Sequence, residues 1–211
     1  MGKFEVGVLG NFDGKIGTVV GAKWKGIEYM RHKGRKSKKP PTAAQLEQRA
    51  KFSCVIKLVN AMTNVLAACY PDSPKKTALN HAFSDIYAKA LTGIYPAYGL
   101  DYSKVSVSKG VLFNGDKPVA TAAGSGIIKF TWNDNTDNNL ALATDKAVLV
   151  AYCPELENAV CILQGAARSQ GTDSLNMKNF TGMVIETWIA FMSANGQEVS
   201  SSSYAGQLIV S

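Results

Sequence analysis

The residues best suited to do chemistry are cations gathered in one stretch of the chain. Ten of the 23 Lys and Arg residues lie between Lys23 and Lys51, interleaved with Trp24, Tyr29 and Met30. Such cations attract phosphates in a salt-dependent way, and an aromatic ring can stack on a base. A solvated basic loop is the simpler interpretation. The positions that we expect to contact phosphate or a protein partner are Lys23, Lys25, Arg31, Lys33, Arg35, Lys36, Lys38, Lys39 and Arg49.

The net charge is concentrated in the N-terminal half. The formal net charge is +7, and residues 1–41 alone carry ten Lys or Arg against three Asp or Glu. Residues 42–98 carry six against three, and residues 99–211 carry seven against ten, which gives +3 and −3. This asymmetry favours an acidic or polyanionic partner for the N-terminal half.

Nucleophilic catalysis needs a base close to a nucleophile, and the chain has two histidines. His32 lies inside the basic run. His81 and Asp85 are four residues apart, so both fall on one helix face, and a surface pair is the simpler interpretation. Glu155 and Glu157 flank an expected hairpin tip and are predicted to be solvated. No enzyme class has a signature here, and we expect a non-enzymatic protein.

Two glycine motifs resemble nucleotide-binding loops only superficially. The segment GNFDGK at 10–15 has one residue too few between its glycines, and Ile16 replaces the hydroxyl that meets magnesium. The segment GSG at 124–126 is an incomplete dinucleotide fingerprint, so a turn is expected.

The four cysteines, Cys54, Cys69, Cys153 and Cys161, form no CxxC pair and are not spaced with the histidines as zinc ligands. We expect reduced core thiols, although the second pair flanks a hairpin where the two side chains could face each other. The sequence thus predicts no metal, no cofactor and no small-molecule substrate.

The N-terminus, MGKFEVGVLG, lacks the apolar core of a secretory signal, and Val6 stands where myristoylation requires Ser or Thr. No run approaches the roughly eighteen apolar residues of a membrane span. We therefore expect a cytoplasmic protein with no membrane partner. Incorporation of this protein into an assembled particle is compatible with that expectation.

The first 98 residues predict a glycine-rich β segment followed by a helical hairpin. Residues 1–36 contain eight glycines between short apolar stretches, and NFDGK at 11–15 carries a hairpin signal, which favours a β-hairpin or meander. Pro40 and Pro41 end it, and a capping pattern at Thr42 predicts a helix of about 25 residues that Pro71 closes. A second helix is expected to begin near 73–74 or at 77 and to end at Gly93.

After residue 98 the pattern changes to short strands about ten residues apart. Strands are predicted within 104–112, 126–134, 146–154, 159–169, 173–177, 184–193 and 204–211, separated by turns such as Asn195-Gly196. This spacing favours an antiparallel β-sandwich. We expect an α+β protein with a boundary near 98–110 and two domains, 1–98 and 99–211.

Two resemblances accompany this pattern. The segments FTW (130–132), VLVAY (148–152) and WIAFMSANGQEVSSSSYAG (188–206) resemble a fibronectin type III or immunoglobulin-like sandwich, with Trp132 as an early core tryptophan. Over nearly the whole chain, GNFDGKIGTVVGAKWKGIEYMR, PPTAAQLEQRAKF, DKAVLVAYCPE, GAARSQGT and FMSANGQEVSSSSYAGQ resemble an uncharacterised bacterial family defined only as a domain of unknown function. The layout is also similar to small phage and virion-like assembly proteins.

Two functions follow as expectations. The first is a structural or assembly protein, phage- or virion-like, that contacts copies of itself or a protein partner through its basic arm and sandwich edges. The alternative is a sequence-nonspecific nucleic-acid-binding protein that uses residues 23–51. Neither expectation excludes the other in a particle that encloses nucleic acid.

Overall fold

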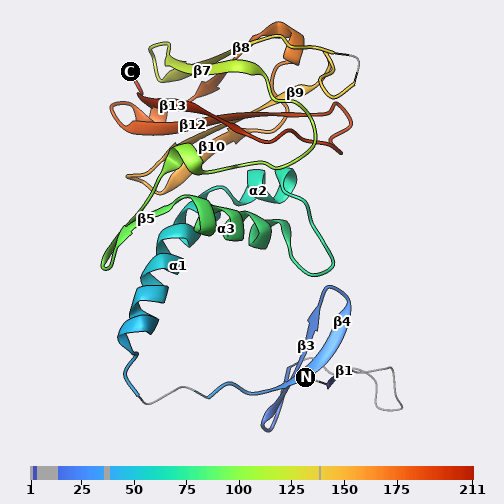
Figure 1. Ribbon diagram of the computed structural model, residues 1–211, viewed down its shortest axis with the longest axis vertical. Helices are drawn as coiled ribbons and strands as arrows, with labels where there is room; N and C mark the ends of the chain where they lie inside the picture. The colour runs from blue at the N-terminus through green and yellow to red at the C-terminus, as the bar shows by residue number, and fades with distance from the viewer. Residues whose placement is uncertain (1, 4–13, 36–38, 138) are drawn as a thin grey trace. The chain divides into compact units, whose positions relative to one another are not determined.

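The computed structural model describes residues 2–3, 14–35, 39–137 and 139–211. Its contacts divide the chain into two compact units, Met1–Thr42 and Ala43–Ser211. The fold is mixed α+β with several antiparallel sheets, as the sequence predicted (Figure 1).

The first unit is a small antiparallel sheet with the strand order β1-β4-β3-β2. β3 and β4 join through Lys25-Gly26, where both residues have positive φ (47° and 80°). Such a turn matches the twist of the two strands, and glycine adopts it without strain. The turn predicted at 11–15 falls largely outside the described residues. The strands are β1 (Gly2–Lys3), β2 (Gly14–Ile16), β3 (Val19–Trp24) and β4 (Ile27–His32).

The long helix predicted to reach Pro71 is broken in two. α1 spans Ala43–Ala61 and α2 spans Thr63–Cys69, and the two axes differ by 82° across Met62. At the break, the Thr63 hydroxyl donates to the carbonyl oxygens of the preceding turn, which competes with straight helix geometry. Among the described helices, none has alone the length and apolar composition to cross a membrane, and only this bent pair meets both criteria together.

The third helix, α3 (Ala78–Lys89), begins at one of the two predicted positions. The Thr77 hydroxyl accepts a hydrogen bond from the Asn80 backbone N–H at 3.3 Å, which is the N-cap interaction. The expected end at Gly93 is wrong, because the chain leaves the helix at Ala90. Gly93, with φ of 92°, lies instead in a hairpin formed by β5 (Leu91–Ile94) and β6 (Ala97–Leu100).

Seven further strands form two antiparallel sheets in the second unit. A four-stranded sheet has the order β10-β9-β12-β13, and a three-stranded sheet has the order β11-β8-β7. Figure 1 shows the three-stranded sheet on one side of the four-stranded sheet and the helices on the other. The strands are β7 (Asp116–Ala122), β8 (Ile127–Asn133), β9 (Lys146–Cys153), β10 (Asn158–Ile162), β11 (Thr172–Asn176), β12 (Val184–Met192) and β13 (Ser203–Ile209).

Two predicted strands need correction. No strand forms at 104–112, where the chain runs irregularly after a 3-10 turn, η1 (Tyr102–Lys104). Strand β7 was not predicted, because a proline such as Pro118 disfavours the interior of a strand. Pro118 is tolerated because β7 is the edge strand of its sheet and has a register shift between Asp116 and Val119. The strand predicted at 159–169 ends at Ile162. A turn does form where Asn195-Gly196 predicted it, with the Gly196 N–H donating to Ser193 O at 2.8 Å.

The two central strands of the four-stranded sheet, β9 and β12, are buried on both faces. Along β9, Val148, Val150 and Tyr152 pack with the helices, whereas Leu149 and Cys153 pack against the three-stranded sheet. Burial on both faces explains why this strand reads as one continuous apolar run. Because helices and sheet share a core, the compact unit runs from residue 43 to 211, and its limit does not coincide with the boundary expected near 98–110.

Candidate functional site

The basic residues of the β3–β4 hairpin, Lys23 and Lys25, differ in their surroundings. Lys23 is paired with Glu28 on the facing strand (Nζ–Oε1 3.3 Å), so its charge is partly neutralised. Lys25 occupies the exposed turn, with its ammonium 5.8 Å from the centre of the Trp24 ring. The tip of the β3–β4 hairpin therefore presents a cation beside an aromatic ring.

One face of the first sheet carries a row of cations that the sequence analysis identified only in part. Lys15 of β2 is opposite Val20 of β3, which is opposite Arg31 of β4. Directly opposite residues share a face of the sheet, so Lys15 and Arg31 flank Val20. Tyr29 lies two residues from Arg31 on the same face. Lys15 was not among the cations predicted from the sequence. Its position beside the predicted turn, together with strand alternation, would have placed it on this face.

The connector after β4 forms a cavity of about 530 Å³. The connector is held in place by a hydrogen bond in which the Lys33 backbone N–H donates to Thr18 O at 2.8 Å. The residues that line it are Gly17, Thr18, His32, Lys33, Gly34 and Arg35.

The remaining predicted cations are not gathered at this cavity within the described chain. Lys36 and Lys38 lie outside the described residues. Lys39 is exposed in the connector, and Arg49 is exposed on α1, in the second unit. The structure therefore brings together Lys33 and Arg35 at the cavity and Lys15 and Arg31 on the sheet.

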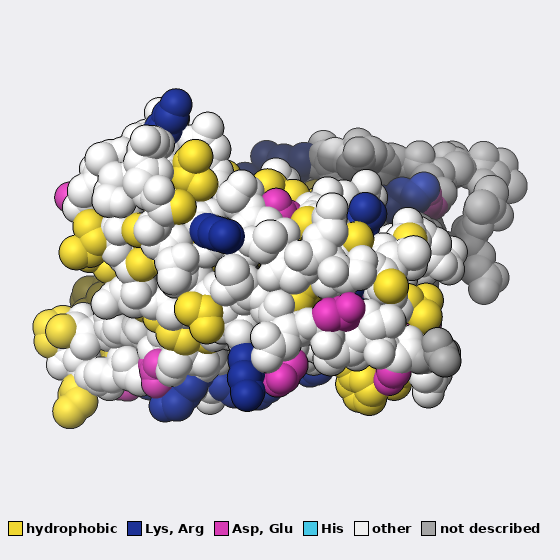
Figure 2. Space-filling model, turned by 90° about the horizontal axis from the view of Figure 1, so that it is seen from above, with side chains coloured by type: hydrophobic (Ala, Val, Ile, Leu, Met, Phe, Trp, Pro, Cys, Tyr) yellow, Lys and Arg dark blue, Asp and Glu magenta, His cyan; other side chains and the backbone are white. Residues whose placement is uncertain are grey.

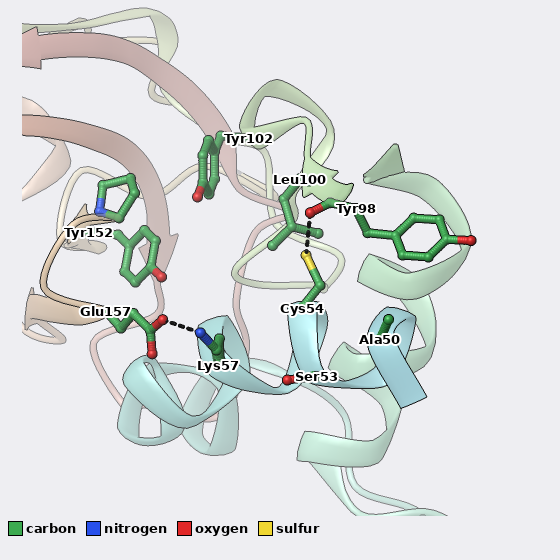
Figure 3. A pocket seen from close by; sticks show the side chains of 11 residues that line it. Ala50, Ser53, Cys54, Lys57, Tyr98, Leu100, Tyr102, Tyr152 and Glu157 are labelled. Carbon is green, nitrogen blue, oxygen red and sulfur yellow. Dashed lines mark hydrogen bonds and ion pairs between the residues drawn. The ribbon is translucent and has the colours of Figure 1, made fainter. Parts of the chain in front are cut away.

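A second concave site, in the Ala43–Ser211 unit, was not predicted. A cavity of about 420 Å³ opens between α1, β6, η1 and the hairpin of β9 and β10 (Figure 3). No sequence motif marks it, because its residues come from segments more than a hundred positions apart, from Ala50 to Glu157. The lining residues are Ala50, Ser53, Cys54, Lys57, Tyr98, Gly99, Leu100, Tyr102, Tyr152, Pro154 and Glu157.

Two tyrosines form one side of this tyrosine cavity. The ring centres of Tyr102 and Tyr152 are 5.9 Å apart, and Tyr152 is only 4% exposed. Burial raises the pKa of Tyr102 to about 12 and raises the pKa of Tyr152 further. Both hydroxyls therefore stay protonated at neutral pH and can donate hydrogen bonds.

The wall of the tyrosine cavity also carries two charged side chains. Lys57 and Glu157 form an ion pair, and the hydrogen bond from Lys57 to Glu157 raises the pKa of the lysine. The Cys54 thiol lies 3.8 Å from Tyr98 O, and burial raises its pKa. The Cys54 thiol therefore stays protonated and is less nucleophilic. This argues against a reactive cysteine at this position.

The other constellations considered from the sequence are not brought together. His81 Nε2 lies 3.3 Å from the Ser73 hydroxyl, while Asp85 pairs with Lys109 (2.9 Å), so the expected pair of His81 and Asp85 is replaced by two others. Within the described residues, no group of three or more His, Cys, Asp and Glu side chains is placed to hold a metal ion.

The four cysteines are free thiols. Cys153 packs between the two sheets, whereas Cys161 packs on the helical side of the four-stranded sheet. The possibility that these two side chains face each other is therefore wrong. The cause is strand alternation: Cys153 is opposite Asn158, and Cys161 lies three residues further along β10.

The fold and these sites define a mixed α+β protein built mostly of antiparallel strands, with two concave surfaces. The chain belongs to a family of unknown function, DUF6266, whose profile matches residues 11–206. The expected membership of a family defined only as a domain of unknown function is thereby confirmed, while its bacterial source stays a prediction. No curated protein matches the sequence.

Proposed function

We propose that the protein is a non-enzymatic structural protein that assembles with further copies of itself through its first unit. The observation that carries this proposal is the exposure of apolar side chains on a small sheet. Ile16, Trp24 and Ile27 are 62%, 41% and 43% exposed, and among the described residues of this unit only Gly21 is buried. A sheet of this kind gains stability when a partner covers its apolar side chains.

The charges favour a second copy as that partner. The first unit is strongly basic, whereas residues 99–211 carry a net charge of −3. Opposite charges steer the basic unit of one copy towards the sheets of another. Such a head-to-tail contact uses different surfaces on each copy, so it builds open chains unless rotation closes a ring. A phage- or virion-like particle is one context for such a chain.

The second unit fits this structural role. If β7 to β13 are lettered A, B, C, C′, E, F and G, the four-stranded sheet contains C′, C, F and G and the other contains A, B and E. An immunoglobulin-like sandwich divides its strands in this way, and fibronectin type III domains share the architecture. Such sandwiches serve widely as interaction modules, and β10 is an edge strand open to addition. Figure 2 shows the described hydrophobic side chains of one face in several small groups.

Light scattering after size exclusion tests the assembly. We expect the mass to rise with protein concentration and to fall when salt is raised from about 50 mM to about 500 mM, because screening weakens the charge attraction. The variant Trp24→Ser/Ile27→Ser is expected to be monomeric. The matched control Leu46→Ser/Ile94→Ser removes two exposed apolar side chains that lie outside the sheets of β7 to β13 and is expected to keep the parent mass. A monomer at every concentration would refute the proposal.

Nonspecific nucleic-acid binding is a second candidate, favoured by the row of Lys15 and Arg31 beside Tyr29. Cations with an adjacent aromatic ring suit a single strand. Fluorescence anisotropy with a labelled single-stranded oligonucleotide tests it, and three phosphate contacts predict a slope of log K on log salt of about −2. The variant Arg31→Gln/Lys33→Gln/Arg35→Gln should lose binding, while Lys104→Gln/Lys109→Gln/Lys129→Gln removes the same charge elsewhere and should not. Equal binding by both variants would exclude this candidate.

A further inference from the structure

Strand β10 forms an open edge of the four-stranded sheet. It pairs with β9 on one side and with no described strand on the other. The Ala159 N–H donates to the Asn158 side-chain oxygen at 2.8 Å, so this N–H points away from β9. Residues of an antiparallel pair alternate between bonded and non-bonded positions, so Cys161 directs its N–H and C=O outward as well. The main-chain groups of Ala159 and Cys161 therefore present the hydrogen-bonding pattern that a further strand matches.

The other edge strands of the second unit carry features that hinder strand addition. β7 contains Lys117, Pro118 and a register shift, and β11 contains Asp173. β13 lies against β7, and its register with β12 is interrupted beside Gly206, whose φ is 116°. Charges, prolines and bulges are the means by which proteins prevent edge pairing. The sequence of β10, NAVCI, contains neither a charge nor a proline, and its register with β9 is regular.

The hairpin tip that precedes β10 is acidic and partly apolar. Glu155 and Glu157 are exposed, and Leu156 between them is 50% exposed. Glu157 pairs with Lys57, as Figure 3 shows, whereas Glu155 forms no ion pair within the described chain. A matching partner is therefore an extended strand that carries a cation and an apolar side chain.

The first unit has an edge strand with these properties. β2 lies at one edge of its sheet and is longer than β1 at the other edge. Its Lys15 is exposed and forms no ion pair within the described chain, and Ile16 is 62% exposed. A basic residue and an apolar residue thus stand side by side on β2, as an acidic and an apolar residue do beside β10.

We propose that β2 of one copy adds to the first residues of β10 of a second copy, with Lys15 facing Glu155 and Ile16 beside Leu156. This inference rests on the proposed assembly and identifies the surface that receives the first unit. The two four-stranded sheets continue across the contact as one sheet of eight strands. Because β2 and β10 are different surfaces, each copy at the end of a chain keeps one of them open, and the chain of copies extends.

Light scattering of full-length variants tests the role of the edge. Ala159→Pro removes an N–H that does not bond to β9 and places the proline ring at the edge, a position that sheets tolerate. We expect this variant to melt like the parent and to stay monomeric at concentrations at which the parent assembles. Ala159→Val keeps the N–H and is the matched control, expected to assemble like the parent. Equal assembly of Ala159→Pro and the parent would overturn the inference and leave the proposed assembly intact, whereas a monomeric parent would refute both.

Charge reversal provides a test that does not depend on the proline. Glu155→Lys and Lys15→Glu, both at exposed positions, should each weaken assembly about fivefold at about 50 mM salt, because an attraction becomes a repulsion. The variant Lys15→Glu/Glu155→Lys should recover the parent affinity. The control Lys15→Glu/Glu198→Lys reverses the same number of charges at exposed positions and should not recover it. Unchanged affinity of the single variants, or additive losses in Lys15→Glu/Glu155→Lys, would overturn the contact even where the parent assembles.

Discussion

Arg168 and Asp145 form an ion pair that water does not reach. Their side chains are 0% and 1% exposed, and Arg168 Nη2 lies 3.1 Å from Asp145 Oδ2. The same guanidinium donates to Asn135 Oδ1 and to Phe113 O, and its centre lies 4.1 Å from that of the Phe191 ring. One arginine thus fastens two irregular segments to the core between the sheets.

Removing this arginine should destabilise the protein strongly. In Arg168→Met the Asp145 carboxylate stays buried without its partner, and we expect a loss of about 3–5 kcal/mol in the free energy of unfolding, measured with urea. Adding Asp145→Asn should recover part of that loss. Lys109→Met, which breaks an exposed pair with Asp85, should cost less than about 1 kcal/mol. Similar losses for both single variants would contradict the structural role of the buried pair.

Gly110 is required by close packing. A Cβ atom at this position would lie 2.0 Å from the carbonyl oxygen of Val199, which is backbone and cannot rotate away. We expect Gly110→Ala to lower the free energy of unfolding by about 1–3 kcal/mol. Gly99→Ala is the control, because its Cβ would meet only Thr92 Oγ1 at 3.8 Å. Thermal unfolding of both variants checks the difference, and equal melting temperatures would refute it.

Stability should fall at alkaline pH. Burial raises the pKa of both Tyr70 and Tyr102 from 10.0 to about 12. Between these values the folded protein keeps protons that the unfolded chain has lost, so this stability is complete below about pH 10 and is lost as the pH approaches 12. Urea midpoints and tyrosinate absorbance measured across this range provide the check. Midpoints that rise with pH would contradict the assignment.

The thiols should react in two classes. Cys54 and Cys161 are partly exposed, and burial raises the pKa of each, so iodoacetamide should label them slowly and faster as the pH rises towards 9. Cys69 and Cys153 are buried and should react only after unfolding. Mass spectrometry of time points assigns each site. A disulfide between Cys153 and Cys161 in the folded protein would contradict their placement on opposite faces of the sheet.

Much of the fold was predictable from local patterns. The strand pattern predicted β9 and β12, and Thr77 was one of the two predicted starts of α3. The break at Met62 was not predictable, because neither proline nor glycine stands there. Strand β7 was hidden by Pro118, which only an edge position tolerates. These errors arise where the tertiary context outweighs the local preference.

The candidate sites were predictable to very different degrees. Charge counting found the cations around Arg31 and Lys33, because they are neighbours in the sequence. The tyrosine cavity could not be predicted from the sequence, because Lys57, Tyr102 and Tyr152 come together only when α1 packs beside the β9–β10 hairpin. A site assembled from distant segments leaves no spacing pattern to read.

Burial of β9 and β12 on both faces limits how the chain can be divided into fragments. A fragment that begins at residue 99 would lose the helices that cover Val148, Val150 and Trp188, and its uncovered face would promote aggregation. Neither the helices nor the three-stranded sheet can leave without exposing one side of β9 and β12. Residues 43–211 should therefore melt in a single cooperative transition, because the helices cover the face of the four-stranded sheet that the three-stranded sheet leaves open.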